Sequence, residues 1–182
     1  MRDRPLEPRG ISLATISVVA LLACTPGGHA TAQEPAASTG LTSEPGTKRQ
    51  QDVRAKGADV MPFSLEKTMH YFDKTAEGGI QRVRTRTDAP DQIAMIRAHL
   101  HEIATSFASR DFDKPAHIHG NDMPGLAQLQ SAKPDELSVD YQELPDGAEI
   151  AYRGHTPTVV KAIHRWFDAQ LSDHGHDATA GH

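Results

Sequence analysis

A short segment in the middle of the chain carries two histidines one residue apart and a methionine close behind them. His117 and His119 flank a single isoleucine, and Met123 follows four residues after His119. In extended backbone, alternate side chains point to the same side, so the two imidazoles are expected to converge on one ion. The Met123 thioether would be a further ligand. A loop whose histidines only form hydrogen bonds is the alternative interpretation.

Two further histidines lie beside the apolar stripes of predicted helices. His99 follows Ile96 by three residues and precedes Ile103 by four, so it borders the apolar face of its helix. His164 borders a second stripe and has Asp168 four residues later. At that spacing a carboxylate can fix the tautomer of a ligating imidazole. For each helix alone, a partly buried histidine bonded to its neighbour is the simpler explanation.

Together these residues predict a transition-metal site. The predicted set comprises three principal ligands, two additional ligands and one orienting carboxylate: His99, His119 and His164; His117 and Met123; and Asp168. Imidazole with a thioether suits copper, and imidazole with a carboxylate suits zinc, with a weak preference for copper. Ligating imidazoles must be neutral, so metal affinity is expected to fall as the pH drops through about 6.5.

The elements that would position these residues form a unit that occurs twice. In the first copy, alternating segments at 69–75 and 80–85 flank a turn that contains two glycines. A helix is expected to begin at Asp88, because Pro90 and Asp91 suit its first turn, and this helix carries His99.

The second copy repeats this order of elements. Segments at 137–141 and 150–152 alternate around a Pro-Asp-Gly turn, and Thr156 with the following proline begins the second helix. The duplication predicts an α+β fold, in which a four-stranded antiparallel sheet has two helices packed on one face. Residues 112–135, between the copies, are expected to form a loop.

The N-terminal residues have the pattern of an export signal. Arg2, Arg4 and Arg9 precede an uncharged apolar run at 11–23. This run is shorter than the roughly 20 residues that a membrane span needs, and it has the length of the apolar core of a signal peptide.

Two processing sites are compatible with a signal peptide over residues 1–32. Residues 21–24 are typical of a bacterial lipobox, in which Cys24 becomes the lipidated first residue of the mature protein. Cleavage after Ala32 by an ordinary signal peptidase is the alternative. Either route predicts a protein of the periplasm, or one anchored to the membrane of the bacterial cell envelope.

Composition divides the rest of the chain into three parts. Residues 33–60 contain no aromatic side chain and are rich in small and polar residues, which predicts a flexible linker. Residues 61–174 hold all the aromatic residues and are expected to form a single α+β domain. Residues 175–182 form a histidine-containing tail.

Charge and cysteine content exclude several classes of protein. The 182 residues include 19 Lys and Arg against 24 Asp and Glu, for a net charge of −5, and no long cationic run. Nucleic acid is therefore not expected as a partner, and the membrane is expected only through the signal peptide or a lipid anchor. A single cysteine excludes an internal disulfide, a cysteine-rich zinc module and a c-type haem site.

The sequence lacks the common catalytic motifs. It has no P-loop, no G-x-G-x-x-G, no G-x-S-x-G and no H-E-x-x-H. We therefore expect no nucleotide cofactor, assign no catalytic residue and favour a protein that handles a metal ion without being an enzyme. One alternative is an interaction module with structural histidines that binds an envelope protein. Another is a small hydrolase that activates a metal-bound water.

Two longer motifs carry a resemblance to a known family. The segments His-Gly-Asn-Asp-Met-Pro-Gly-Leu at 119–126 and His-Arg-Trp-Phe-Asp-Ala-Gln-Leu at 164–171, with Asp-His-Gly at 173–175, resemble a family of small exported bacterial proteins often labelled aspartate carbamoyltransferase. The resemblance spans about residues 60–182 and implies export. Transcarbamoylases have two α/β domains and a Ser-Thr-Arg-Thr-Arg loop, whereas this chain has only Arg-Thr-Arg-Thr at 84–87. Transcarbamoylase activity is therefore not expected.

Overall fold

The computed structural model describes residues 46–181. The chain divides into two units, Met1–Thr42 and Ser43–His182, and all described residues belong to the second. The expected signal peptide, with Cys24 and Ala32, and the first part of the expected linker lie outside the described residues. Among residues 46–181, no helix has both the length and the apolar character that crossing a membrane requires.

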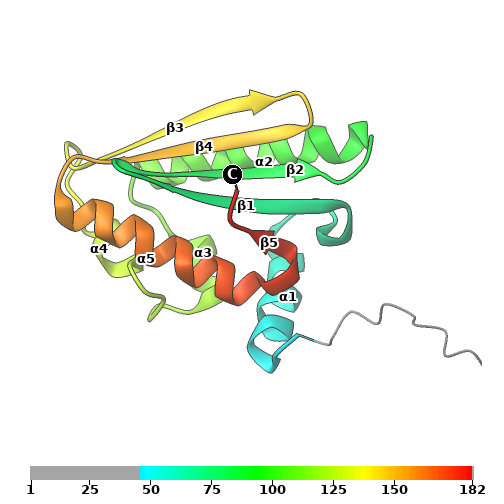
Figure 1. Cartoon of the computed structure of the whole chain (residues 1–182), viewed down its shortest axis with the longest axis horizontal. Coiled ribbons are helices and arrows are strands. Elements are labelled where there is room, and N and C mark those ends of the chain that lie inside the picture. The colour runs from blue at the N-terminus through cyan, green and yellow to red at the C-terminus, as the bar shows by residue number, and fades with distance from the viewer. Residues whose placement is uncertain (1–45, 182) are drawn as a thin grey trace, which may run out of the picture. The chain divides into compact units, whose positions relative to one another are not determined.

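A five-stranded mixed sheet forms one side of the domain (Figure 1). Its strands are β1 Thr68–Thr75, β2 Gly78–Thr85, β3 Leu137–Leu144, β4 Gly147–Gly154 and β5 Ala178–Thr179. The order is β3-β4-β2-β1-β5, with antiparallel pairing throughout except for β5, which is parallel to β1. The α+β class is confirmed. The sequence predicts a four-stranded antiparallel sheet and misses β5, because a strand of two residues is too short to show alternation of apolar and polar side chains.

The two hairpins join through their second strands, so that Ile80 of β2 faces Ala151 of β4. Each hairpin is followed by a long helix, α2 Pro90–Ala108 or α5 Pro157–His174. The α5 start was predicted correctly, since Thr156 caps it by accepting a hydrogen bond from the Val159 amide. Helix α2 begins two residues later than expected and has no side-chain cap.

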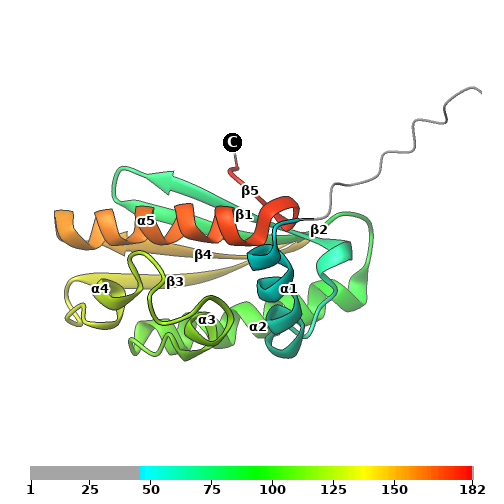
Figure 2. The ribbon, with the colours of Figure 1, turned by 90° about the horizontal axis from the view of Figure 1, so that it is seen from below.

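All the helices lie on one side of the sheet (Figures 1 and 2). Helix α2 packs on β3 and β4, and α5 packs on β1, β2 and β4. The remaining helices are α1 Lys48–Val60, α3 Asp113–His119 and α4 Leu126–Gln130, with short 3-10 turns at Leu65–Lys67 and Gly175–Asp177. Helices α1 and α4 pack against α5, and α3 packs against α1.

Helices α1, α3 and α4 are corrections to the sequence prediction. Helix α1 occupies part of the expected flexible linker at 33–60, and α3 and α4 occupy the expected loop at 112–135. Helix α1 was not predicted because it is polar and buries only Val53 and Gly57, so it shows no apolar stripe. Its start is marked by a capping box between Thr47 and Gln50. Helices of 7 and 5 residues are too short to show helical periodicity.

The C-terminal residues are ordered against the sheet rather than forming a loose tail. Helix α5 extends to His174, a 3-10 turn follows, and β5 then pairs with His70 and Tyr71 of β1. Asp177 is buried in this segment and forms an ion pair with Arg54 of α1. Long-range pairing of this kind has no local signature in the sequence.

An aromatic cluster fills the core between the sheet and the helices. The Trp166 ring centroid lies 5.4 Å from that of Tyr152 and 5.8 Å from that of Phe107. Phe107 stacks on Phe112 at 4.2 Å, and all four of these residues are at most 3% exposed. This cluster packs α5 against α2 and β4, and its members Phe107 and Trp166 also line the cavity described below.

Gly125 provides a test of how α4 packs on α5. Its φ is +85°, and a Cβ atom at this position would lie 2.2 Å from the Ala162 carbonyl oxygen. We expect Gly125→Ala to lower the free energy of unfolding by about 2–4 kcal/mol, because it combines backbone strain with a steric clash. Urea denaturation measures the change. The exposed Gln128→Ala is the control, with an effect within about 0.5 kcal/mol; equal unfolding midpoints for the two variants would contradict this packing.

Candidate functional site

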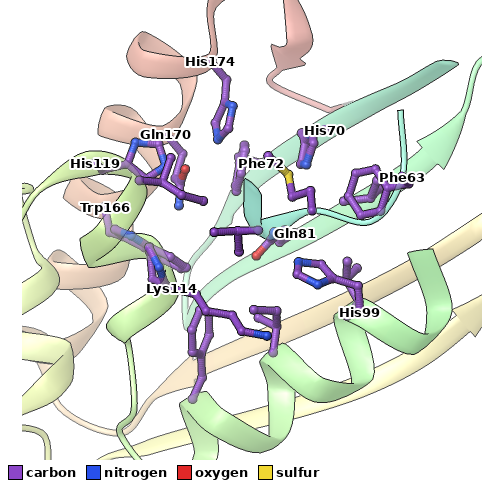
Figure 3. Close-up of a pocket in the computed structure, with 18 residues that line it drawn as sticks. Phe63, His70, Phe72, Gln81, His99, Lys114, His119, Trp166, Gln170 and His174 are labelled. Atoms are coloured by element: carbon purple, nitrogen blue, oxygen red, sulfur yellow. The ribbon is translucent and has the colours of Figure 1, made fainter. Parts of the chain in front are cut away.

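The candidate site is a cavity of about 60 Å³ between the sheet and the helices. Its walls come from β1, β2, α2, α3, α5, the end of α1 and the segment that follows it. Figure 3 shows the labelled side chains around this space. One water molecule needs roughly 10–15 Å³ of such a volume, so the cavity has room for several waters or one compact molecule.

Four histidines from four different elements line this cavity. They are His70 of β1, His99 of α2, His119 of α3 and His174 of α5. None is more than 8% exposed. Polar residues of this kind are rarely buried together, so their presence in one cavity requires a physical explanation.

Three of these imidazoles form a contact cluster, which we call the imidazole triad: His70, His119 and His174. The His174 ring centroid lies 5.2 Å from that of His70 and 5.1 Å from that of His119. The His70 and His174 rings are nearly parallel, at 9°, whereas the His119 and His174 rings are inclined at 75°. His99 lies outside the triad, with its ring 5.6 Å from the Phe63 ring.

A chain of charged contacts holds His119 in place. The His119 Nδ1 and Asp173 Oδ2 atoms are 2.9 Å apart. Arg49 of α1 donates to the same carboxylate at 2.6 Å and to the His119 carbonyl oxygen at 3.1 Å. Burial acts to raise the pKa of Asp173, but the hydrogen bonds from Arg49 and His119 outweigh it and hold that pKa below its usual value. Asp173 is therefore an anion whose Oδ2 accepts a hydrogen bond from the Nδ1–H group of His119.

Burial lowers the pKa of all four cavity histidines. The pKa of His70 falls to about 4, opposed by a backbone hydrogen bond to Asp177, and that of His99 also falls to about 4. The pKa of His174 falls well below its ordinary value, and burial outweighs Asp173 in lowering that of His119. The imidazoles are consequently neutral at physiological pH, each with one nitrogen that carries a lone pair.

The cavity lining contains buried polar atoms that have no hydrogen-bond partner. Among the described residues, four buried side-chain atoms lack a partner, and three of them belong to cavity residues: His70 Nδ1, Trp166 Nε1 and Gln170 Oε1. The fourth belongs to Asp146, in the turn between β3 and β4. A buried polar atom that finds neither a protein partner, a ligand nor an ordered water costs about 1–3 kcal/mol, so these atoms mark where a ligand or an ordered water would be stabilised.

Of the six side chains predicted to bind or orient a metal ion, the structure brings two to this cavity. His99 and His119 line it, and both are buried. His117 is exposed, because the His-x-His segment is helical: two residues in α3 point to nearly opposite sides, whereas in extended backbone they would share one.

The other three predicted residues lie elsewhere. Met123 is 3% exposed and belongs to the hydrophobic core. His164 Nε2 lies 2.9 Å from the Thr75 carbonyl oxygen, at the end of β1. Asp168 forms an ion pair with Lys74 rather than orienting His164. The i,i+4 spacing of His164 and Asp168 therefore reflects two separate contacts of α5 with β1.

Two triad residues were not in the predicted set, although the sequence holds a signal for each. His70 alternates with Phe72 in β1 and so faces the core. His174 follows Gln170 by four residues and Phe167 by seven, so it continues the buried face of α5. In the sequence analysis His174 is the last residue of the expected domain and is not assigned as a ligand.

As the side chains stand in residues 46–181, no group of three or more His, Cys, Asp or Glu residues is arranged to hold a metal ion. The nearly parallel His70 and His174 rings give a reason. An imidazole binds a metal in the plane of its ring, so two stacked rings do not direct their lone pairs at one point.

Comparison of the chain with models of protein families, with curated proteins and with solved structures gives no match.

The buried histidines predict how stability depends on pH. A histidine with a folded-state pKa of about 4 and an ordinary value of 6.5 binds its proton first in the unfolded chain. Stability is therefore complete above about pH 6.5 and is lost as the pH falls from 6.5 towards 4. We expect urea unfolding midpoints to fall across this window. His99→Leu should reduce the number of protons taken up on unfolding in this window by about one, whereas the exposed, non-titrating Gln128→Leu should leave it unchanged. Equal pH dependence of the two variants would refute this origin.

Proposed function

We propose that this protein is an exported component of the bacterial cell envelope that binds a transition-metal ion through the imidazole triad. Export rests on the signal pattern in residues 1–32. The observation that carries metal binding is the contact between His119 Nδ1 and Asp173. A carboxylate on one ring nitrogen fixes the tautomer and leaves the other nitrogen, here Nε2, as the ligand.

The spacing of the rings supports this proposal. For metal–nitrogen bonds of about 2.0–2.1 Å in tetrahedral geometry, the centroids of two ligating imidazoles lie roughly 5 Å apart. The two contacts of His174 measure 5.2 Å to His70 and 5.1 Å to His119. Both contacts of His174 therefore have the spacing of ligating imidazoles, and the stacked His70 and His174 rings must rotate before both can bind one ion. The triad comes from three elements, β1, α3 and α5.

The protonation state of the triad also favours a cation. Each imidazole is neutral at physiological pH because burial lowers its pKa. A metal ion would therefore bind without displacing protons, which normally weaken imidazole ligation as the pH falls. His70 Nδ1 is buried without a partner, so a metal ion would also supply the contact that this atom lacks.

The choice of metal is zinc or copper, on the basis of imidazole ligands. Met123 does not line the cavity, so the thioether that favoured copper in the sequence is not part of the proposed site. His99, His117 and His164 are likewise not proposed as ligands, and Asp173 replaces Asp168 as the orienting carboxylate.

The test is a metal titration of the mature protein that is left after the signal peptide is removed. The protein is purified without an affinity tag, and a chelator removes any bound metal before the titration. We expect one Zn²⁺ or Cu²⁺ per chain by calorimetry, with loss of binding in His174→Ala and His119→Ala. Asp173→Asn should weaken binding about 10–100-fold, the usual effect of removing an orienting carboxylate. The control variants His117→Ala and His164→Ala should bind as the wild type does.

Thermal melting of each variant separates loss of the site from loss of the fold. If the triad variants do not fold, the wild-type protein is tested instead by recording the ¹⁵N chemical shifts of its imidazoles. The resonances of three histidines should then shift when zinc is added. No stoichiometric uptake, or equal uptake by His174→Ala and the wild type, would refute the proposal and favour structural histidines.

A further inference from the structure

Helix α1 is held on the domain by polar contacts more than by burial of apolar side chains. Of its 13 residues, only Val53 and Gly57 are buried. The Gln50 side chain donates to the Ser172 carbonyl oxygen at 3.0 Å, near the C-terminal end of α5. Helices in proteins are stabilised mainly by packing of an apolar face, and an isolated helix of this length is marginal in water. The attachment of α1 therefore depends on a small set of polar contacts.

Two arginines of α1 bind carboxylates that are buried in the domain. Arg49 pairs with Asp173 of α5. Arg54 pairs with Asp177, in the turn that follows α5. The side chains of both aspartates are 5% exposed, whereas those of the arginines are 55% and 34% exposed. The two arginines lie roughly 7.5 Å apart along the helix axis, so together they fix both the position and the direction of α1.

The chain continues from α1 into a segment that is anchored by apolar burial. Met61, Phe63 and Leu65 are each at most 8% exposed and belong to the hydrophobic core. The backbone is extended at Met61, where α1 ends. A rotation between Val60 and Met61 would therefore move α1 and leave the following segment in the core.

Helix α1 also borders a groove that reaches His119. Together with α3 and the loop after it, α1 lines a surface groove of about 420 Å³. Ile118 and His119 line both this groove and the buried cavity, although the His119 side chain is only 2% exposed. Figure 2 shows α1 beside α3 and the C-terminal end of α5. Moving α1 away would therefore open the cavity to solvent on the side of His119.

We propose that α1 is a strap that opens as a unit and admits a ligand to the histidine cavity. In the closed form, its arginines hold the carboxylates of Asp173 and Asp177. In the open form, α1 pivots between Val60 and Met61, water hydrates both carboxylates, and His119 faces the widened groove. Elements with few buried apolar contacts are those that open below the free energy of global unfolding. The opening rests on the contacts of α1, and its role in metal entry rests on the proposed function of the imidazole triad.

Hydrogen exchange of the mature protein, with a chelator present throughout, tests the opening. We expect the amides of residues 52–60 to share one opening constant and to exchange at least about tenfold faster than the buried amides of α5. Exchange of α1 at the same rate as α5 would overturn the proposal. A gradient of rates along α1, as fraying from one end produces, would also overturn it.

Arg54→Gln removes one charged contact and leaves the contacts among Arg49, Asp173 and His119 in place. The exchange of α1 should rise at least about tenfold, because a buried carboxylate loses its partner, and the exchange of α2 should not change. The control is Arg153→Gln, since Arg153 pairs with an aspartate of β3, outside α1.

Equal exchange of α1 in these two variants would refute the role of the ion pairs. If Arg54→Gln does not fold, the wild type is measured at low and high salt instead. Salt screens charges that have separated, so it should speed exchange in α1 and leave α2 unchanged.

Stopped-flow mixing with zinc tests entry of the metal. A strap that closes again over the bound ion should make association and dissociation faster by the same factor in Arg54→Gln, so that the dissociation constant stays unchanged. Weaker binding with an unchanged association rate would overturn the role of α1 in entry. Absence of zinc uptake by the wild type would refute the metal site instead, whereas the exchange measurements, made without metal, decide separately whether α1 opens as a unit.

Discussion

The contact between Arg49, Asp173 and His119 is the constraint on which the rest of the site depends. Asp173 is 4% exposed, and a carboxylate at that depth is tolerated only when it is paired and hydrogen-bonded. Its two partners come from α1 and α3, so one buried anion joins three helices that are far apart in the sequence. Removing one partner would leave a buried charge uncompensated and would also release a wall of the cavity.

The duplicated topology explains why a cavity forms at this position. Each hairpin directs its own helix onto the same face of the sheet, so α2 covers β3 and β4 while α5 lies mainly over β1 and β2. The smaller elements α1 and α3 then close the space that the two long helices leave between them. Gln81 and Val83 of β2 contribute to the floor. The first copy of the unit supplies His70 and His99 to the walls, and the second supplies His174.

The parts of the fold with periodic patterns could be predicted from the sequence, and the parts held by distant contacts could not. The hairpins and the two long helices were predicted because alternation and stripes of apolar residues are local signals. Helix α1 and strand β5 are held by Arg49, Arg54 and pairing with β1, none of which is visible in a local window. The same division explains the site: His119 was identified from its motif, whereas His174 depended on recognising that α5 extends that far.

The distribution of unfavourable features argues for a site rather than for imperfect packing. Buried histidines and polar atoms without partners each reduce stability, and a packing defect would place such features anywhere in a core. Here four buried histidines and three of the four unpartnered atoms found in residues 46–181 share one cavity. Sequences that specify their fold consistently elsewhere depart from that consistency where function requires it. The pairing of the strands and the capped starts of α1 and α5 follow the ordinary rules of packing, so the cavity is the part of the described domain where a ligand would give these residues the partners that they lack.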